Sequence, residues 1–170
     1  MSRRRGGHTG ASVALALALA AATVGCGDDP SGCKGTQYPA RHGDRVSIAQ
    51  GLWGDVWFWS GDFMPVCASG TITGVARPMR IYELTSMDQA VLARGPFFRR
   101  VSTRLIASVT ADRDGFFQVQ LPPGRYSLFA QEDSLLYANS FDGLGNIYPV
   151  TVDSARVSET RFDIDYEATH

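Results

Sequence analysis

The stretch RLIASVTADRDGFFQVQLPPGRYSLFA, residues 104–130, decides the fold of this 170-residue chain. It has the pattern of three short β-strands joined by two tight turns. In the middle strand Phe117, Val119 and Leu121 alternate with glutamines, the two-residue period of a half-buried strand. Gly115 after Asp114 supplies the positive φ of a hairpin turn, and the Pro-Pro-Gly at 122–124 reverses the chain again. The stretch therefore predicts a β-sheet protein.

The segment ADRDGFFQVQLPPGRYSLFA, residues 111–130, resembles the signature of carboxypeptidase regulatory-like domains. The shared features are a DxxG turn, an aromatic residue, an alternating strand and a PPGxY turn. Other segments resemble a subgroup of these domains in bacterial envelope lipoproteins, and the resemblance covers about residues 51–166. Those segments are GDFMP at 61–65, IYELTSMDQA at 81–90, GPFF at 95–98 and YANSFDGLGN at 137–146.

The resemblance implies an all-β fold, namely a seven- to eight-stranded antiparallel β-sandwich of the prealbumin-like, Greek-key type. This architecture is shared with carbohydrate-binding modules. A capping-box pattern at Ser86 and Gln89 adds one short helix near residues 87–93. The resemblance transfers no established activity, because the regulatory-like domain is an accessory module beside carboxypeptidases and lacks their zinc site.

The N-terminal residues 1–25 have the features of a bacterial lipoprotein signal peptide. Three arginines at 3–5 precede an apolar run at 11–22, which is shorter than the ~20 residues of a membrane-spanning helix. Thr23-Val24-Gly25-Cys26 resembles a lipobox, with Cys26 as the lipidated residue, although Thr23 stands where Leu is usual. The alternative is cleavage after Ala22, which releases a free secreted protein. Residues 26–50 are polar and aperiodic and predict a flexible tether, with the domain at 51–168.

Removing the signal peptide takes three arginines from the 16 basic residues and leaves 13 against 17 acidic, a net charge of −4. No basic stripe remains, which argues against nucleic-acid binding. With Cys26 lipidated, Cys33 and Cys67 are left, and an exported chain favours a disulfide between them. Two free thiols are the alternative. The predicted location is the bacterial cell envelope, lipid-anchored in a membrane and facing the periplasm or the exterior.

The strand at 51–59 carries all three tryptophans of the chain on one face, at Trp53, Trp57 and Trp59. Such a face suits stacking on a sugar, because each indole combines an apolar body with an N–H donor. The alternative, which the rarity of exposed apolar patches favours, is that the tether or the insertion at 87–100 covers these side chains. The sequence thus predicts either a carbohydrate-binding platform or a second small core.

Oxygen-rich loops raise the question of a metal ion. Asn139, Asp142 and Asn146 form a cluster that suits Ca²⁺, although such side chains more commonly hydrogen-bond the backbone of their own loop. Asp112 and Asp114 fit a plain turn better than a calcium loop. No cofactor is expected.

Catalytic motifs are absent from the sequence: it has no G-x-S-x-G, no H-E-x-x-H and no glycine-rich phosphate loop. His8 lies in the signal peptide, His42 in the predicted tether and His170 at the end of the chain, so no histidine base is expected inside the fold. We therefore expect a non-enzymatic, lipid-anchored binding or scaffolding module, with a carbohydrate or an envelope protein as its partner. The alternative function is carbohydrate binding through the aromatic strand face.

Overall fold

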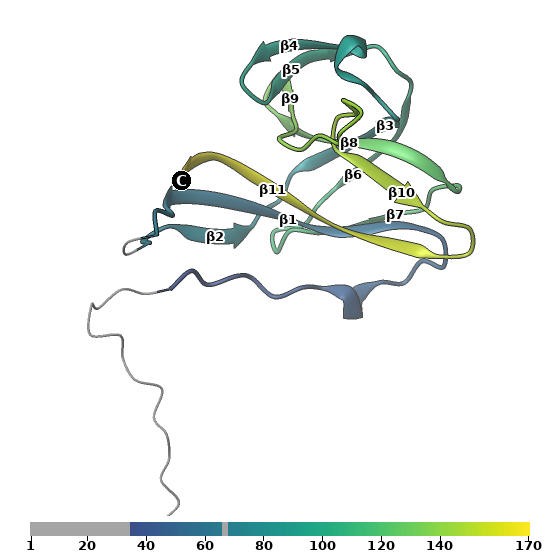
Figure 1. Ribbon diagram of the computed structural model, residues 1–170. Helices are drawn as coiled ribbons and strands as arrows, with labels where there is room; N and C mark the ends of the chain where they lie inside the picture. The colour runs from purple at the N-terminus through teal and green to yellow at the C-terminus, as the bar shows by residue number, and fades with distance from the viewer. Residues whose placement is uncertain (1–34, 66–67) are drawn as a thin grey trace, which may run out of the picture.

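The computed structural model describes residues 35–65 and 68–170 as two packed β-sheets (Figure 1). This confirms the predicted all-β sandwich. The described part holds eleven strands and two 3₁₀ turns, η1 (Gly43–Arg45) and η2 (Met87–Gln89). The strands are β1 (Gly51–Asp62), β2 (Thr71–Gly74), β3 (Pro78–Glu83), β4 (Ala90–Arg94), β5 (Phe97–Val101), β6 (Leu105–Thr110), β7 (Phe116–Val119), β8 (Gly124–Glu132), β9 (Leu135–Tyr137), β10 (Pro149–Val152) and β11 (Val157–Thr169).

The smaller sheet, sheet A, is built around β1. On one side β1 pairs in parallel with β11, with Val56 opposite Phe162. On the other side its two halves pair antiparallel with β2 and β7. The β1–β11 pair is thus a parallel exception to the predicted antiparallel pattern.

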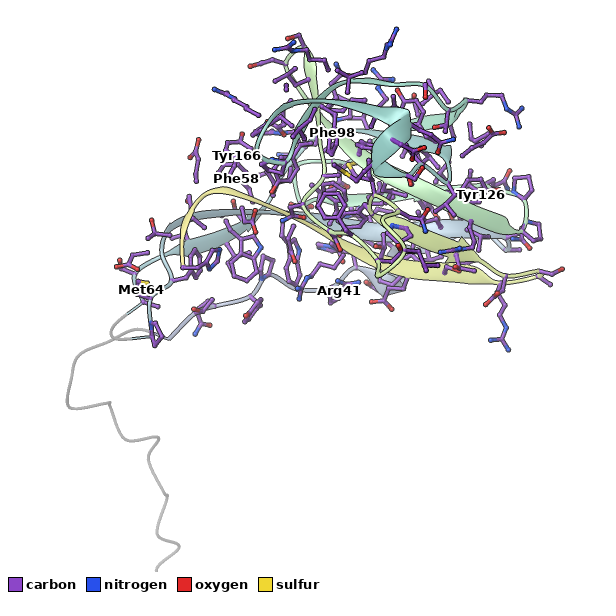
Figure 2. The ribbon with its side chains drawn as sticks, turned by 45° about the horizontal axis from the view of Figure 1, so that its top comes forward. Arg41, Phe58, Met64, Phe98, Tyr126 and Tyr166 are labelled. Carbon is purple, nitrogen blue, oxygen red and sulfur yellow. The ribbon has the colours of Figure 1, made fainter. Side chains whose placement is uncertain are left out.

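The larger sheet, sheet B, has the strand order β4-β5-β9-β8-β3-β6, with β10 added beside β8. Both faces of β8 are buried, because Leu128 points into one core and Phe129 into another. The first core fills the space between the sheets and the second lies beneath the curled β4–β5–β9 end (Figure 1). Phe98 is a fully buried member of the second core (Figure 2).

The three strands predicted in the stretch 104–130 are confirmed as β6, β7 and β8. They do not form consecutive hairpins, however. β6 and β8 both pair with β3 in sheet B, whereas β7 pairs with β1 in sheet A. The turn at Gly115 therefore carries the chain from one sheet to the other. Gly115 has φ +91°, and a Cβ there would lie 2.4 Å from the carbonyl oxygen of Val56.

Two details of the predicted fold are corrected. The chain has more strands than the predicted seven or eight, and the helix expected near 87–93 is confined to Met87–Gln89. The Gln89 side chain accepts the Ser86 N–H at 3.0 Å and closes one turn. Ala90 then starts β4, which pairs antiparallel with β5. The Greek-key topology stays a prediction.

Candidate functional site

Residues 38–47, here called the arm, lie along the outer face of sheet A (Figure 1). For these residues this corrects the flexible tether predicted at 26–50, because the arm is fixed to β1. The face it covers presents Trp53, Asp55, Trp57 and Trp59, which alternate with core residues along β1.

Arg41 is the centre of the contact between the arm and β1 (Figure 2). Its guanidinium carbon lies 5.4 Å from the ring centre of Trp53 and 5.6 Å from that of Trp57, within cation–π range. Its Nε lies 3.2 Å from Asp55 Oδ2, and its terminal nitrogen bonds Glu159. The arginine therefore joins two indoles and two carboxylates.

His42 is a further partner of Asp55, whose side chain is wholly buried. Its Nδ1 lies 2.6 Å from Asp55 Oδ1, and its backbone N–H donates to Oδ2 at 3.4 Å. A buried carboxylate needs such partners, because an unpaired charge in the interior costs several kcal/mol. His42 was expected to lie in the flexible tether. Instead it holds the arm in place.

The two ends of the arm close over the aromatic face. The ring centre of Tyr38 lies 6.0 Å from that of Trp57. The guanidinium carbon of Arg45 lies 4.4 Å from the ring centre of Phe116. Trp53 is 8% exposed and Trp57 3%. For Trp53 and Trp57 the expected alternative is confirmed: the arm, rather than the insertion at 87–100, makes these two indoles a small second layer of packing.

Trp59 is the tryptophan at the open end of this face. It is half-buried, and its Nε1 donates to Asp163 Oδ1 at 3.0 Å. It borders a groove of about 420 Å³ at the outer edge of β11. The groove is lined by Trp59, Asn139, Ser140, Tyr148, Arg161, Asp163, Asp165 and His170.

The polar groups of this groove are held in fixed positions. Arg161 pairs with Asp163 at 2.8 Å. The Tyr137 hydroxyl donates to Asp165 Oδ1 at 2.6 Å and accepts the Asp165 N–H at 3.1 Å, while Tyr148 donates to the Arg161 carbonyl. Burial raises the pKa of both tyrosines, so their hydroxyls stay protonated donors. An indole beside fixed carboxylate, guanidinium and amide groups can bind a neutral, hydroxyl-rich molecule.

The predicted metal residues are used differently. Asp142 Oδ1 accepts the backbone N–H of Leu144 and of Asn146, both at 2.9 Å. Its Oδ2 accepts the Asn146 amide at 2.7 Å and Arg125 at 3.2 Å. The Asn146 contacts are the main reason that the pKa of Asp142 is lowered. Asn139 lies apart, in the groove. The loop thus follows the alternative in which its side chains satisfy its backbone.

Within residues 35–65 and 68–170, no three His, Cys, Asp or Glu side chains gather as metal ligands would. In the same part of the chain no helix is long and apolar enough to cross a membrane. Cys26, Cys33 and Cys67 lie outside the described residues, so the lipidation and the disulfide stay predictions.

The residues that make the contact between the arm and β1 were missed at the sequence level. The arm has no apolar periodicity, since its contacts come from Arg41, His42 and Tyr38. One signal was present: Asp55 stands among tryptophans in an otherwise apolar strand. A carboxylate on such a face requires a cationic partner from elsewhere in the chain.

No protein-family model, no curated protein and no solved structure matches this chain.

Proposed function

We propose that this chain is a non-enzymatic β-sandwich of the bacterial envelope, lipid-anchored at Cys26, that acts as a binding or scaffolding module. The observation that carries the proposal is the fixed arm. The arm joins the segment after Cys26 to the centre of sheet A through Arg41 and His42. Any link to a membrane therefore enters a rigid part of the fold.

The arm also limits how far the domain can stand from an anchor. Residues 27–37 separate Cys26 from Tyr38. Fully extended, these residues span at most about 40 Å. A lipid on Cys26 would therefore hold the sandwich close to the bilayer surface, which suits a module that presents a binding surface there.

The use of His42 and Asp55 supports a non-enzymatic role. A histidine–carboxylate pair is a common catalytic arrangement. Here the carboxylate is buried against Arg41 as well, and the pair holds the arm on the sheet. His42 and Asp55 therefore serve to hold the fold together.

Metabolic labelling with palmitate tests the anchor. We expect label in the wild-type chain, none in Cys26→Ser, and undiminished label in the control Cys33→Ser. A wild-type chain that is exported and carries no label would overturn the anchor and favour the free secreted protein.

Carbohydrate binding is the second candidate function, and the groove at Trp59 favours it. Since Trp53 and Trp57 are covered, the proposed site moves from the three-tryptophan platform to Trp59 with Asn139 and Asp165. Pull-down on insoluble starch, cellulose, chitin and peptidoglycan tests it. Trp59→Ala should weaken retention at least about tenfold, as truncation of an aromatic anchor does. Tyr38→Phe is the control, and equal retention of all three chains, or none, would reject this site.

A further inference from the structure

Exposed apolar side chains occur on η2, on β4 and in the loop at 139–146. η2 and β4 belong to the end of sheet B that lies away from the arm (Figure 1). We call these side chains the η2 patch: Met87 40% exposed, Val91 42%, Leu92 49%, Phe141 47% and Leu144 80%. The Met87 N–H donates to the Gly145 carbonyl at 3.1 Å, and Ser86 bridges Asn146, which brings η2 against the loop at 139–146. Large exposed apolar patches on a soluble domain commonly mark a contact surface.

Leu144 is held in its exposed position by the loop. Asp142 accepts the N–H groups of Leu144 and Asn146, and the Gly145 N–H donates to the Asp142 carbonyl at 3.1 Å. The turn is therefore fixed with the leucine pointing away from both cores. A preorganised apolar tip loses little conformational entropy when it enters an apolar medium.

Three arginines lie on β4 and β5, next to the β4 part of this surface. Residues 86–101 contain Arg94, Arg99 and Arg100 and a single acid, Asp88, in a chain of net charge −1. Within the described part none of these three arginines forms an ion pair. Glu132 and Asp133 share a groove with Arg94, so Arg99 and Arg100 supply most of the uncompensated charge. Arg100 stands opposite Val91 in the β4–β5 pair.

We infer that the η2 patch docks on the headgroup region of an anionic lipid bilayer. Leu144, Val91 and Leu92 enter the boundary of the acyl chains, while Arg99 and Arg100 meet lipid phosphates. Apolar side chains flanked by unpaired arginines match the composition of surfaces that lie in this interface.

The contact is independent of the lipid on Cys26 and compatible with it. A domain of this length has a diameter of roughly 35–40 Å, which is similar to the reach of residues 27–37. The anchor and the η2 patch can therefore meet the same bilayer with the sandwich lying on its side.

Co-sedimentation with vesicles tests the inference. Residues 35–170 are used, because they contain every described strand, both cores and the arm, and because they lack Cys26 the result does not depend on the anchor. We expect binding to phosphatidylcholine vesicles with about 30% phosphatidylglycerol, weakened by salt, and much weaker binding to phosphatidylcholine alone. A chain that stays in the supernatant with both vesicles overturns the inference and assigns the patch to a protein partner.

Matched variants locate the contact. Arg99→Gln with Arg100→Gln should lower the partition constant about 30-fold, equivalent to ~1 kcal/mol for each arginine, and Leu144→Ser about tenfold. The controls Arg113→Gln with Arg156→Gln, and Leu105→Ser, remove the same groups from exposed sites elsewhere and should bind as wild type. Equal losses in the variants and their controls would show non-specific attraction and overturn the assigned surface.

Discussion

His42 Nδ1 lies 2.6 Å from Asp55 Oδ1 and so joins the arm to the centre of sheet A. The two residues are 13 positions apart, and the chain between them turns back at η1 before it enters β1. Asp55 would be a buried, uncompensated charge without the arm. The arm is therefore part of the folded domain, and the domain begins before β1.

Removal of the Asp55 charge should destabilise the domain strongly. In Asp55→Asn both Arg41 and His42 lose their buried partner, and we expect the free energy of unfolding to fall by about 3 kcal/mol. Urea unfolding followed by far-UV circular dichroism measures this as a lower midpoint. Asp114→Asn is the control. That carboxylate is 60% exposed and its ion pair with Arg45 is long, at 3.7 Å, so its loss should lower the free energy of unfolding by less than about 0.5 kcal/mol. Similar midpoints for the two variants would contradict a structural role for the His42–Asp55 contact.

Gly115→Ala should disturb the crossing between the two sheets. The residue has φ +91°, and the new methyl group would meet the Val56 carbonyl at 2.4 Å. We expect the free energy of unfolding to fall by about 2 kcal/mol or more, because the backbone is strained and the turn at Gly115 is forced away from β1. Gly143→Ala, at which a Cβ meets nothing within 4 Å, should change the stability by less than about 0.5 kcal/mol. Equal thermal midpoints for the two variants would argue against the close approach at Gly115.

The buried tyrosines should limit stability at high pH. Burial raises the pKa of Tyr137 above the ordinary value of about 10, so the folded chain holds this proton more tightly than the unfolded chain. The stabilisation is complete below about pH 10 and is lost as the pH rises towards the folded pKa. Ultraviolet titration should show Tyr137 and Tyr148 ionising only as the domain unfolds.

A variant isolates the Tyr137 contribution. Tyr137→Phe removes the hydroxyl that bonds Asp165, so we expect a loss of about 1–2 kcal/mol at neutral pH and a shallower fall of stability above pH 10. Tyr38→Phe, whose residue is 58% exposed, should behave as wild type in both respects. Full ionisation of the wild-type tyrosines near pH 10 without unfolding would refute this assignment.

The strands were predictable from the sequence, but their pairing was not. Alternation places Phe117 and Leu121 in the core, and both are buried. Alternation reports which face of a strand is buried, however, and carries no information on the neighbouring strand. The strands with which β7 and β8 pair depend on the close approach of the turn at Gly115 to β1. That approach is a long-range packing effect.

The candidate site was predictable only in part. The aromatic face of β1 was visible as three tryptophans, and its covering by a preceding segment was one of two interpretations. The covering residues were hidden, because cation–π contacts and charge pairs from Arg41 leave no periodic pattern. Cluster composition likewise suggested calcium at Asp142, whereas local N–H groups use its oxygen atoms.

Acrylamide quenching of intrinsic tryptophan fluorescence tests most directly whether the arm closes the aromatic face. We expect blue-shifted emission in which Trp53 and Trp57 resist quenching and only Trp59 is reached, so that Trp59→Phe leaves emission that is almost unquenched. Asp55→Asn, which releases the arm, should raise the accessible fraction. Quenching of all three indoles in the folded wild-type chain, at the rate of free tryptophan, would show that the arm does not cover them and would restore the open three-tryptophan platform.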